Sequence, residues 1–166
     1  MPRHKATCAL PYEPEQLFDL AADVERYPDF LPWWVAARIS QRGRDVYDTD
    51  QVVGFGMVRA RFSSKTVLRR PARIDVISTD RPFRHFNLTW LFDPEPEGGC
   101  RVSLQVDLEF RSPVLEGLFG RAVGNAVGRI VSAFEARARR LHGLPATSGA
   151  ARPGGPDKQD ENASAN

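Results

Sequence analysis

The feature that most constrains the fold is a change of hydrophobic period near residue 112. Before it, apolar residues alternate with polar ones, most regularly over residues 86–92 and 102–110. After it, apolar residues recur at three- and four-residue steps. A period of two is typical of a strand with one buried face, and a period of 3.6 of an amphipathic helix. The pattern therefore predicts an antiparallel sheet whose apolar face is covered by a C-terminal helix.

The same alternation predicts further strands nearer the N-terminus. A first strand over residues 3–10 is followed by a helix over about residues 14–24, which begins at a proline. At most one helical turn fits between the prolines at 28 and 32. In the next strand Val35, Ala37 and Ile39 alternate on one face. The remaining strands are expected over residues 46–55, 58–68 and around 74–76.

The C-terminal helix is expected over about residues 113–142. Ser112 is a good N-cap, a proline follows it, and Gly143 ends the pattern. A 30-residue helix would be roughly 45 Å long. Gly120, Gly124 and Gly128 lie four residues apart on its flank. They fit a helix that lifts to admit a ligand, close approach of a partner helix or membrane, or simple sequence drift.

Length and composition fit one globular domain with a tail. The chain has 166 residues, 42% of them hydrophobic, and its net charge of +2 makes no general case for nucleic acid. Residues 144–166 contain no large apolar side chain after Leu144 and are rich in proline, glycine, alanine and serine. We therefore expect a folded domain over residues 1–143 and a disordered tail over residues 144–166.

Two cysteines, Cys8 and Cys100, are too few for a disulfide scaffold and have no metal-ligand spacing. We expect free thiols in a cytosolic compartment, because the N-terminus has no secretory h-region. No apolar run is long enough for a transmembrane helix.

Catalytic motifs are missing from the sequence. It contains no G-x-S-x-G, H-E-x-x-H or C-x-x-C motif. His4, His85 and His142 are isolated and are interpreted as surface residues. A general base at Asp48 or Asp50 has no further support. We therefore expect no catalytic residue, no metal and no covalent cofactor.

What remains is apolar and basic. A dense apolar cluster over residues 30–34 lies in a proline-broken loop, where it suits lipid capture, membrane contact or ordinary packing of the first helix. Arg59, Arg61 and Lys65 share the outward side of one strand. They predict a solvated face or a patch for anionic lipid or RNA.

Several motifs resemble one family. They are DVERYPDFLPW at 23–33, FSSKTV at 62–67, LEFRS at 108–112 and FEARA at 134–138. Their order and spacing resemble the START-like coenzyme Q-binding proteins of the polyketide cyclase and lipid-transport superfamily, which are close to the ribosome association toxin RatA. An arginine, Arg81, stands where this family usually has glycine before Pro-Phe.

The resemblance implies an α+β helix-grip fold. A curved seven-stranded antiparallel sheet would clasp the long C-terminal helix, with two short helices after the first strand. It also implies non-enzymatic binding of ubiquinone or a related lipid in an apolar cavity, in support of respiratory electron transport. The expected residues of the cavity or its mouth are Leu31, Trp33, Phe55, Phe62, Phe83, Trp90, Phe119, Val123 and Val127.

Two alternatives stay open. A RatA-like protein would bind the ribosome through the basic face and block association of the subunits. A polyketide cyclase would need an acid or base in the cavity, and the sequence offers no convincing one. Under each hypothesis we expect a bacterial cytoplasmic protein with no DNA partner. The lipid-binding hypothesis also fits peripheral contact with the inner membrane.

Overall fold

The computed structural model describes residues 3–143, apart from the side chain of Phe55. The tail predicted to be disordered, residues 144–166, lies outside the described residues.

The elements follow the order that the alternating pattern predicts. The chain runs through β1 (His4–Leu10), α1 (Pro14–Ala22), a 3-10 turn (Val24–Arg26), α2 (Tyr27–Phe30), β2 (Trp34–Arg42), β3 (Val46–Phe55), β4 (Val58–Arg69), β5 (Arg73–Ser78), β6 (Phe83–Pro94), β7 (Cys100–Phe110), α3 (Pro113–Phe119) and α4 (Ala122–His142).

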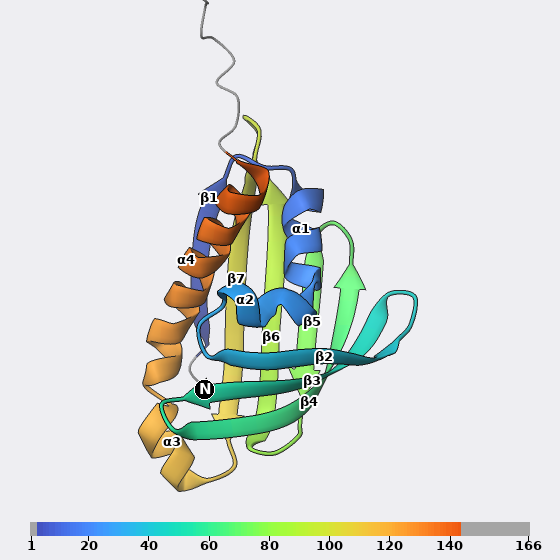
Figure 1. The fold of residues 1–166 in the computed structure, drawn as a ribbon. Helices are drawn as coiled ribbons and strands as arrows, with labels where there is room; N and C mark the ends of the chain where they lie inside the picture. Colours follow the sequence, from blue (N-terminus) through green and yellow to red (C-terminus); the bar gives the residue numbers. More distant parts are fainter. Residues whose placement is uncertain (1–2, 144–166) are drawn as a thin grey trace, which may run out of the picture.

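The seven strands form one antiparallel sheet in the order β1-β7-β6-β5-β4-β3-β2. Figure 1 shows that β2, β3 and β4 cross in front of β6 and β7, so the sheet curls around a concave face. Helix α4 lies along β1 and β7 on this face, and α1 and α2 cover it farther along. The helix-grip prediction is confirmed in sheet order, helix order and curvature.

The prediction of a single helix over residues 113–142 is wrong in one respect, because the helix is broken. Helix α3 ends at Phe119, and α4 begins at Ala122 after Gly120 and Arg121. The apolar spacing continues across the break, from Leu115 and Phe119 to Val123, so periodicity alone does not reveal it.

The three helix glycines have different surroundings. Gly120 lies at the break, beside the Glu116 side chain that folds over it. A Cβ at Gly124 would lie 3.1 Å from the His4 ring, so this glycine allows close approach of α4 to β1. A Cβ at Gly128 would meet nothing within 4 Å. The three glycines therefore do not share one role. The surroundings explain a glycine at positions 120 and 124 but not at position 128.

Strand β2 also departs from the prediction. Its pairing with β3 shifts between Trp34 and Ala36, and the irregularity turns Val35 outward, where it is 45% exposed. Ala37 and Ile39 do pack against the core, as predicted. A bulge inserts one unpaired residue and so reverses the faces of the residues on one side of it.

Candidate ligand-binding cavity

A cavity lies between α4 and the concave face of the sheet. Its lining is entirely apolar: Trp33, Trp34, Val53, Phe62, Phe83, Phe86, Leu88, Val106, Leu108, Phe110, Phe119, Ala122, Val123, Ala126, Val127 and Ile130. Its free volume is about 70 Å³. About 10–15 Å³ of such volume holds one water molecule, so the cavity as it stands has room for a few waters and not for a larger molecule.

Aromatic rings from neighbouring strands form one wall of this cavity. Phe83 lies 5.0 Å from Phe62, 5.1 Å from Phe86 and 5.4 Å from Phe110, measured between ring centroids. Phe119 of α3 closes the row, 6.1 Å from Phe110. Alternation turns Phe62, Phe86 and Phe110 inward. A register shift between Phe83 and His85 brings Phe83 to the same face of β6 as Phe86. The wall therefore offers apolar and ring-stacking contacts.

Trp33 lines the cavity from the loop between α2 and β2. Its backbone is in the left-handed region, with φ of 69°, which is rare for a bulky residue. The Gly54 amide donates to the Trp33 carbonyl at 2.8 Å, and the Arg129 guanidinium lies 5.1 Å from the centre of the Trp33 ring. The first contact fixes the Trp33 backbone to β3, and the second places Arg129 of α4 over the indole ring.

Buried polar side chains adjoin the apolar cavity on the inner face of β3 and β4. The Trp34 indole N–H donates to Gln51 Oε1 at 2.7 Å, and Gln51 Nε2 donates to Ser64 Oγ at 2.7 Å. Thr49 is fully buried, and its hydroxyl has no hydrogen-bond partner among the described residues. The interior is therefore apolar along α4 and polar beneath α1 and α2.

Two tyrosines close the polar end. The Tyr47 hydroxyl donates to the Ala22 carbonyl at 2.7 Å, and the Tyr27 hydroxyl donates to the Ala21 carbonyl. Burial raises the pKa of Tyr47 to about 12 and raises the pKa of Tyr27 well above its ordinary value. Both phenols are thus neutral donors, and they join the end of α1 to β3 through Tyr47 and to α2 through Tyr27.

Sequence reasoning missed this polar group. It followed apolar residues on each strand and left the inward polar positions of β3 unassigned. The sequence does indicate their burial, because Thr49 and Gln51 have the same parity on β3 as the apolar residues Tyr47 and Val53. The carboxylates proposed as bases, Asp48 and Asp50, have the opposite parity, and Asp50 accepts from the exposed Ser63 hydroxyl at 2.6 Å.

Most residues predicted to contact a ligand come together at the cavity. Six of the nine line it, namely Trp33, Phe62, Phe83, Phe119, Val123 and Val127. Phe55 ends β3, and its side chain lies outside the described part of the structure. Leu31 and Trp90 are placed elsewhere.

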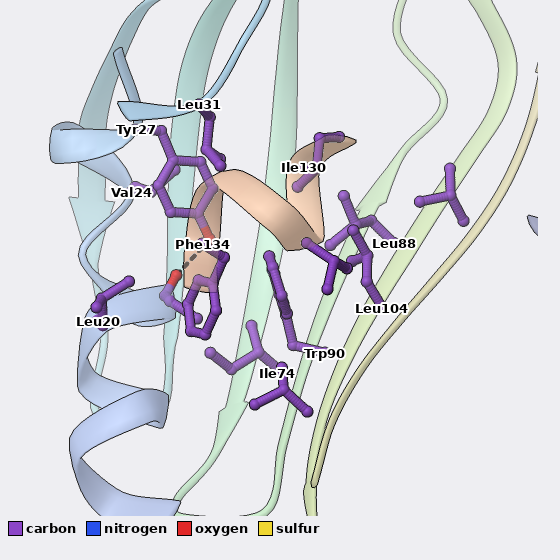
Figure 2. Close-up of a cluster of buried hydrophobic side chains, with 14 of the residues drawn as sticks. Leu20, Val24, Tyr27, Leu31, Ile74, Leu88, Trp90, Leu104, Ile130 and Phe134 are labelled. Atoms are coloured by element: carbon purple, nitrogen blue, oxygen red, sulfur yellow. Dashed lines mark hydrogen bonds between the residues drawn. The ribbon is translucent and has the colours of Figure 1, made fainter. Parts of the chain in front are cut away.

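Trp90 and Leu31 lie in the densely packed core behind the cavity. Trp90 is 1% exposed and its ring centroid lies 4.8 Å from that of Phe134 on α4. Figure 2 shows Trp90 beside Phe134 and Ile74, with Leu31 near Tyr27. Leu31 is 4% exposed. A direct ligand contact by either residue remains a prediction.

The predicted basic face divides into two parts. Arg59, Arg61 and Lys65 are all exposed on the outer side of β4. Lys65, however, lies opposite Asp48 of β3. The outer face is therefore of mixed charge at Lys65, and the basic character is concentrated near Arg59 and Arg61.

The histidine prediction needs two corrections. His4 is half-buried on β1, where its ring lies against Gly124 of α4. His85 is not a simple surface residue: it is half-buried on the outer side of β6, with Nε2 2.9 Å from Asp107 Oδ1 and Nδ1 3.9 Å from Glu109 Oε2. The pairing across β6 and β7 brings these residues together and could not be read from one strand alone. Within residues 3–143, no group of acidic, cysteine and histidine side chains could hold a metal ion. No described helix is long and apolar enough to span a bilayer.

Two known proteins are similar to this chain in sequence over most of their length. Ribosome association toxin RatA of Pseudomonas aeruginosa is 31% identical over 134 residues, which cover 81% of this chain and 93% of the toxin. The mitochondrial coenzyme Q-binding protein coq10 of Schizosaccharomyces pombe is 32% identical over 148 residues, with 85% and 89% covered.

A solved structure and a family model agree with these relatives. The solution structure of an 18 kDa protein from Caulobacter crescentus is 36% identical with a TM-score of 0.70, and the match covers 87% of this chain and all of that one. The model of the polyketide cyclase/dehydrase and lipid transport family matches residues 10–135. The match spans every strand from the end of β1 onward and most of α4, so this chain belongs to the polyketide cyclase/dehydrase and lipid transport family.

Proposed function

We propose that this protein binds ubiquinone or a related isoprenoid lipid in the cavity beneath α4, without covalent chemistry. The observation that carries the proposal is the composition of the lining, whose sixteen residues are all apolar. Burial of an isoprenoid tail gains about 2.5 kcal/mol for each 100 Å² of apolar surface removed from water. Similarity to a coenzyme Q-binding protein supports the same class of ligand.

The lining favours binding over catalysis. A cyclase would need an acid or base that reaches its substrate, and none of the cavity-lining residues in the described chain is ionisable. The polar group around Gln51 adjoins the cavity through Trp34, which lines both regions. Carbonyl oxygens of a quinone head could accept hydrogen bonds there, while the tail follows α4.

Entry of such a ligand requires movement, because the free volume is about 70 Å³. The break at Gly120 and Arg121 is the natural place for it, since α3 buries none of its residues. Outward movement of α3 and the first turn of α4 would separate Phe119 and Val123 from the phenylalanine wall. This proposal places the protein in the bacterial cytoplasm, where it would hold lipid away from water.

The test is purification from a quinone-producing bacterium, organic extraction, and quantification of quinone by absorbance and mass spectrometry. Near-stoichiometric quinone is expected in the wild type. Val123→Trp should fill the cavity and remove the quinone, because the new ring occupies the lining. Ile77→Trp is the matched control, since Ile77 is 47% exposed on another face. An empty wild-type cavity, or quinone retained by Val123→Trp, would contradict the proposal.

A second candidate function is binding of a ribosomal subunit. The observation that favours it is the exposed pair Arg59 and Arg61, together with similarity to ribosome association toxins. Arg59→Glu with Arg61→Glu should then abolish co-sedimentation with ribosomal subunits and leave quinone content unchanged. Co-sedimentation that survives both charge reversals would exclude this face.

A further inference from the structure

Exposed apolar side chains gather at one end of the molecule. Met57 lies in the turn between β3 and β4 and Val58 begins β4, and their side chains are 99% and 45% exposed. Helix α3 carries Val114 and Leu118, which are 69% and 65% exposed. Figure 1 shows this turn and α3 at the same end of the fold. We call these four residues the apolar tip.

The cavity opens at this end. A hollow of about 270 Å³ lies between the start of β4, the start of β6 and α3. It shares four lining residues with the apolar cavity, namely Val53, Phe83, Phe110 and Phe119. Val58 of the tip lines the hollow as well. The hollow is thus the mouth of the cavity, with Val58 at its edge and the other tip residues on the adjoining turn and on α3.

Three arginines line the same hollow. Arg59, Arg61 and Arg81 come from β4 and from the turn before β6, and all three are exposed. No ion pair within the described residues involves any of them. Other arginines are paired, such as Arg70 with Asp19 at 2.9 Å and Arg73 with Asp75 at 2.8 Å. The mouth thus keeps cationic groups without internal counterions.

We propose that this end docks onto the surface of an anionic phospholipid bilayer. The apolar tip would enter the headgroup region, and the three guanidinium groups would pair with lipid phosphates. The three arginines at the mouth favour a polyanionic partner. The exposed apolar tip favours a lipid bilayer over a nucleic acid, because a bilayer can bury apolar side chains. Docking would join the cavity to the membrane interior and spare an apolar ligand from crossing water.

The test is flotation of the full chain with vesicles of phosphatidylcholine alone or mixed with phosphatidylglycerol. The wild type should bind the mixed vesicles much more tightly, and salt should weaken binding. Arg59→Gln with Arg61→Gln and Arg81→Gln should lower the partition coefficient on mixed vesicles by about 100-fold, since each cation near an anionic surface contributes about fivefold. The charge-matched control is Arg44→Gln with Arg69→Gln and Arg140→Gln, which are exposed positions outside the hollow.

The tip is tested separately from the charges. Met57→Asp with Leu118→Asp should abolish flotation. The control, Ile77→Asp with Leu141→Asp, should not, because those side chains are 47% and 53% exposed elsewhere. A Met57→Cys variant labelled with an environment-sensitive fluorophore should show a blue shift on mixed vesicles. Burial raises the pKa of both native thiols, so labelling would be selective.

Each outcome decides the proposal. Flotation lost only in the tip and mouth variants, with unchanged melting temperatures, would support it. Absence of wild-type flotation, or equal losses in the control variants, would overturn it. So would mouth variants that float normally but no longer sediment with ribosomal subunits. The inference is independent of cavity occupancy, because vesicle binding and quinone content are measured separately and can fail separately.

Discussion

Helices α1 and α3 begin alike and end in different surroundings. Each follows a strand and has proline in its first turn. Helix α1 has a capping box between Glu13 and Gln16, and the Ser112 hydroxyl of α3 accepts from the Leu115 amide at 3.4 Å. Yet five of nine residues of α1 are buried, and none of the seven in α3 is. Local start signals thus form both helices, but only packing makes one of them part of the core.

The two helices mark a closed end and an open end of the same concave face. At the closed end Phe18 of α1 packs edge-on against Phe92, 5.8 Å away, and Phe92 neighbours Trp90 and Phe134. At the open end Phe119 is half-buried beside the cavity. We therefore expect stability to reside at the closed end and ligand exchange at the open one.

Truncation of one aromatic side chain at each end gives the largest expected contrast. Trp90→Ala should lower the free energy of unfolding by about 3–5 kcal/mol, because it leaves a cavity in a fully packed region. Phe119→Ala should cost only about 1 kcal/mol, because that ring is already partly exposed. Phe119→Ala should instead lower the affinity for quinone. Urea denaturation measures the first quantity, and quinone content after purification reflects the second.

Similar losses of stability in Trp90→Ala and Phe119→Ala would contradict the assignment of stability to the closed end. The comparison of the two ends would also fail if folded Trp90→Ala lost all quinone while Phe119→Ala retained it, since Trp90 would then be a ligand contact after all. The conservative variant Trp90→Phe serves as the control, because it keeps an aromatic ring beside Phe134 while removing the indole N–H.

The closed end was easier to predict from the sequence than the open end. Alternation on β6 and β7 correctly predicted buried residues such as Phe92 and Val102, because paired strands with one buried face impose a strict period of two. At the open end the same apolar period continued through Gly120, where the helix breaks. A helical period reports which face is apolar, and it does not report whether anything packs on that face.

Six of the nine residues expected to contact a ligand line the cavity, whereas the hollow beside it was not expected from the sequence. The parity of β4 and the apolar stripe of the helix place Phe62 and Val123 inward. Phe83, by contrast, has the opposite parity to Phe86 and was expected at the cavity only with the family resemblance. Met57 and Arg81 received no functional role, because they come from separate turns that only the curled sheet brings near α3. Long-range curvature of a sheet depends on pairing and bulges that one strand's sequence does not encode.

Substitutions of two buried polar residues near the closed end should change the free energy of unfolding by less, and in opposite directions. Gln51→Leu should lower the free energy of unfolding by about 1–3 kcal/mol, because the Trp34 indole N–H and the Ser64 hydroxyl lose their partner. Thr49→Val should leave stability unchanged or raise it by about 1 kcal/mol, since it removes a buried hydroxyl without a partner in the described chain. Urea denaturation of both variants tests this. A destabilising Thr49→Val would mean that the hydroxyl is satisfied in solution.

The smallest expected effect concerns the two thiols, which both lie on strands at the closed end. Burial raises the pKa of Cys8 to about 11 and that of Cys100 to about 12. In the native protein, alkylation by iodoacetamide should therefore rise about tenfold per pH unit from pH 7 to pH 10, with Cys100 the slower residue. In the unfolded chain it should level off near pH 9, close to the ordinary pKa of cysteine. Mass spectrometry of the two cysteine peptides separates the rates.

The raised pKa values also set the sign of a stability change. Above about pH 8.5 an unfolded thiol releases its proton while the folded one keeps it, so the free energy of unfolding should fall as pH rises toward 11. Cys8→Ala should make this fall shallower and leave stability at pH 7 nearly unchanged, because the side chain is only half-buried. A native alkylation rate that levels off at pH 9 would show that the closed end opens to solvent. The contrast between α1 and α3 would then be one of degree, with both ends of the concave face able to admit small molecules.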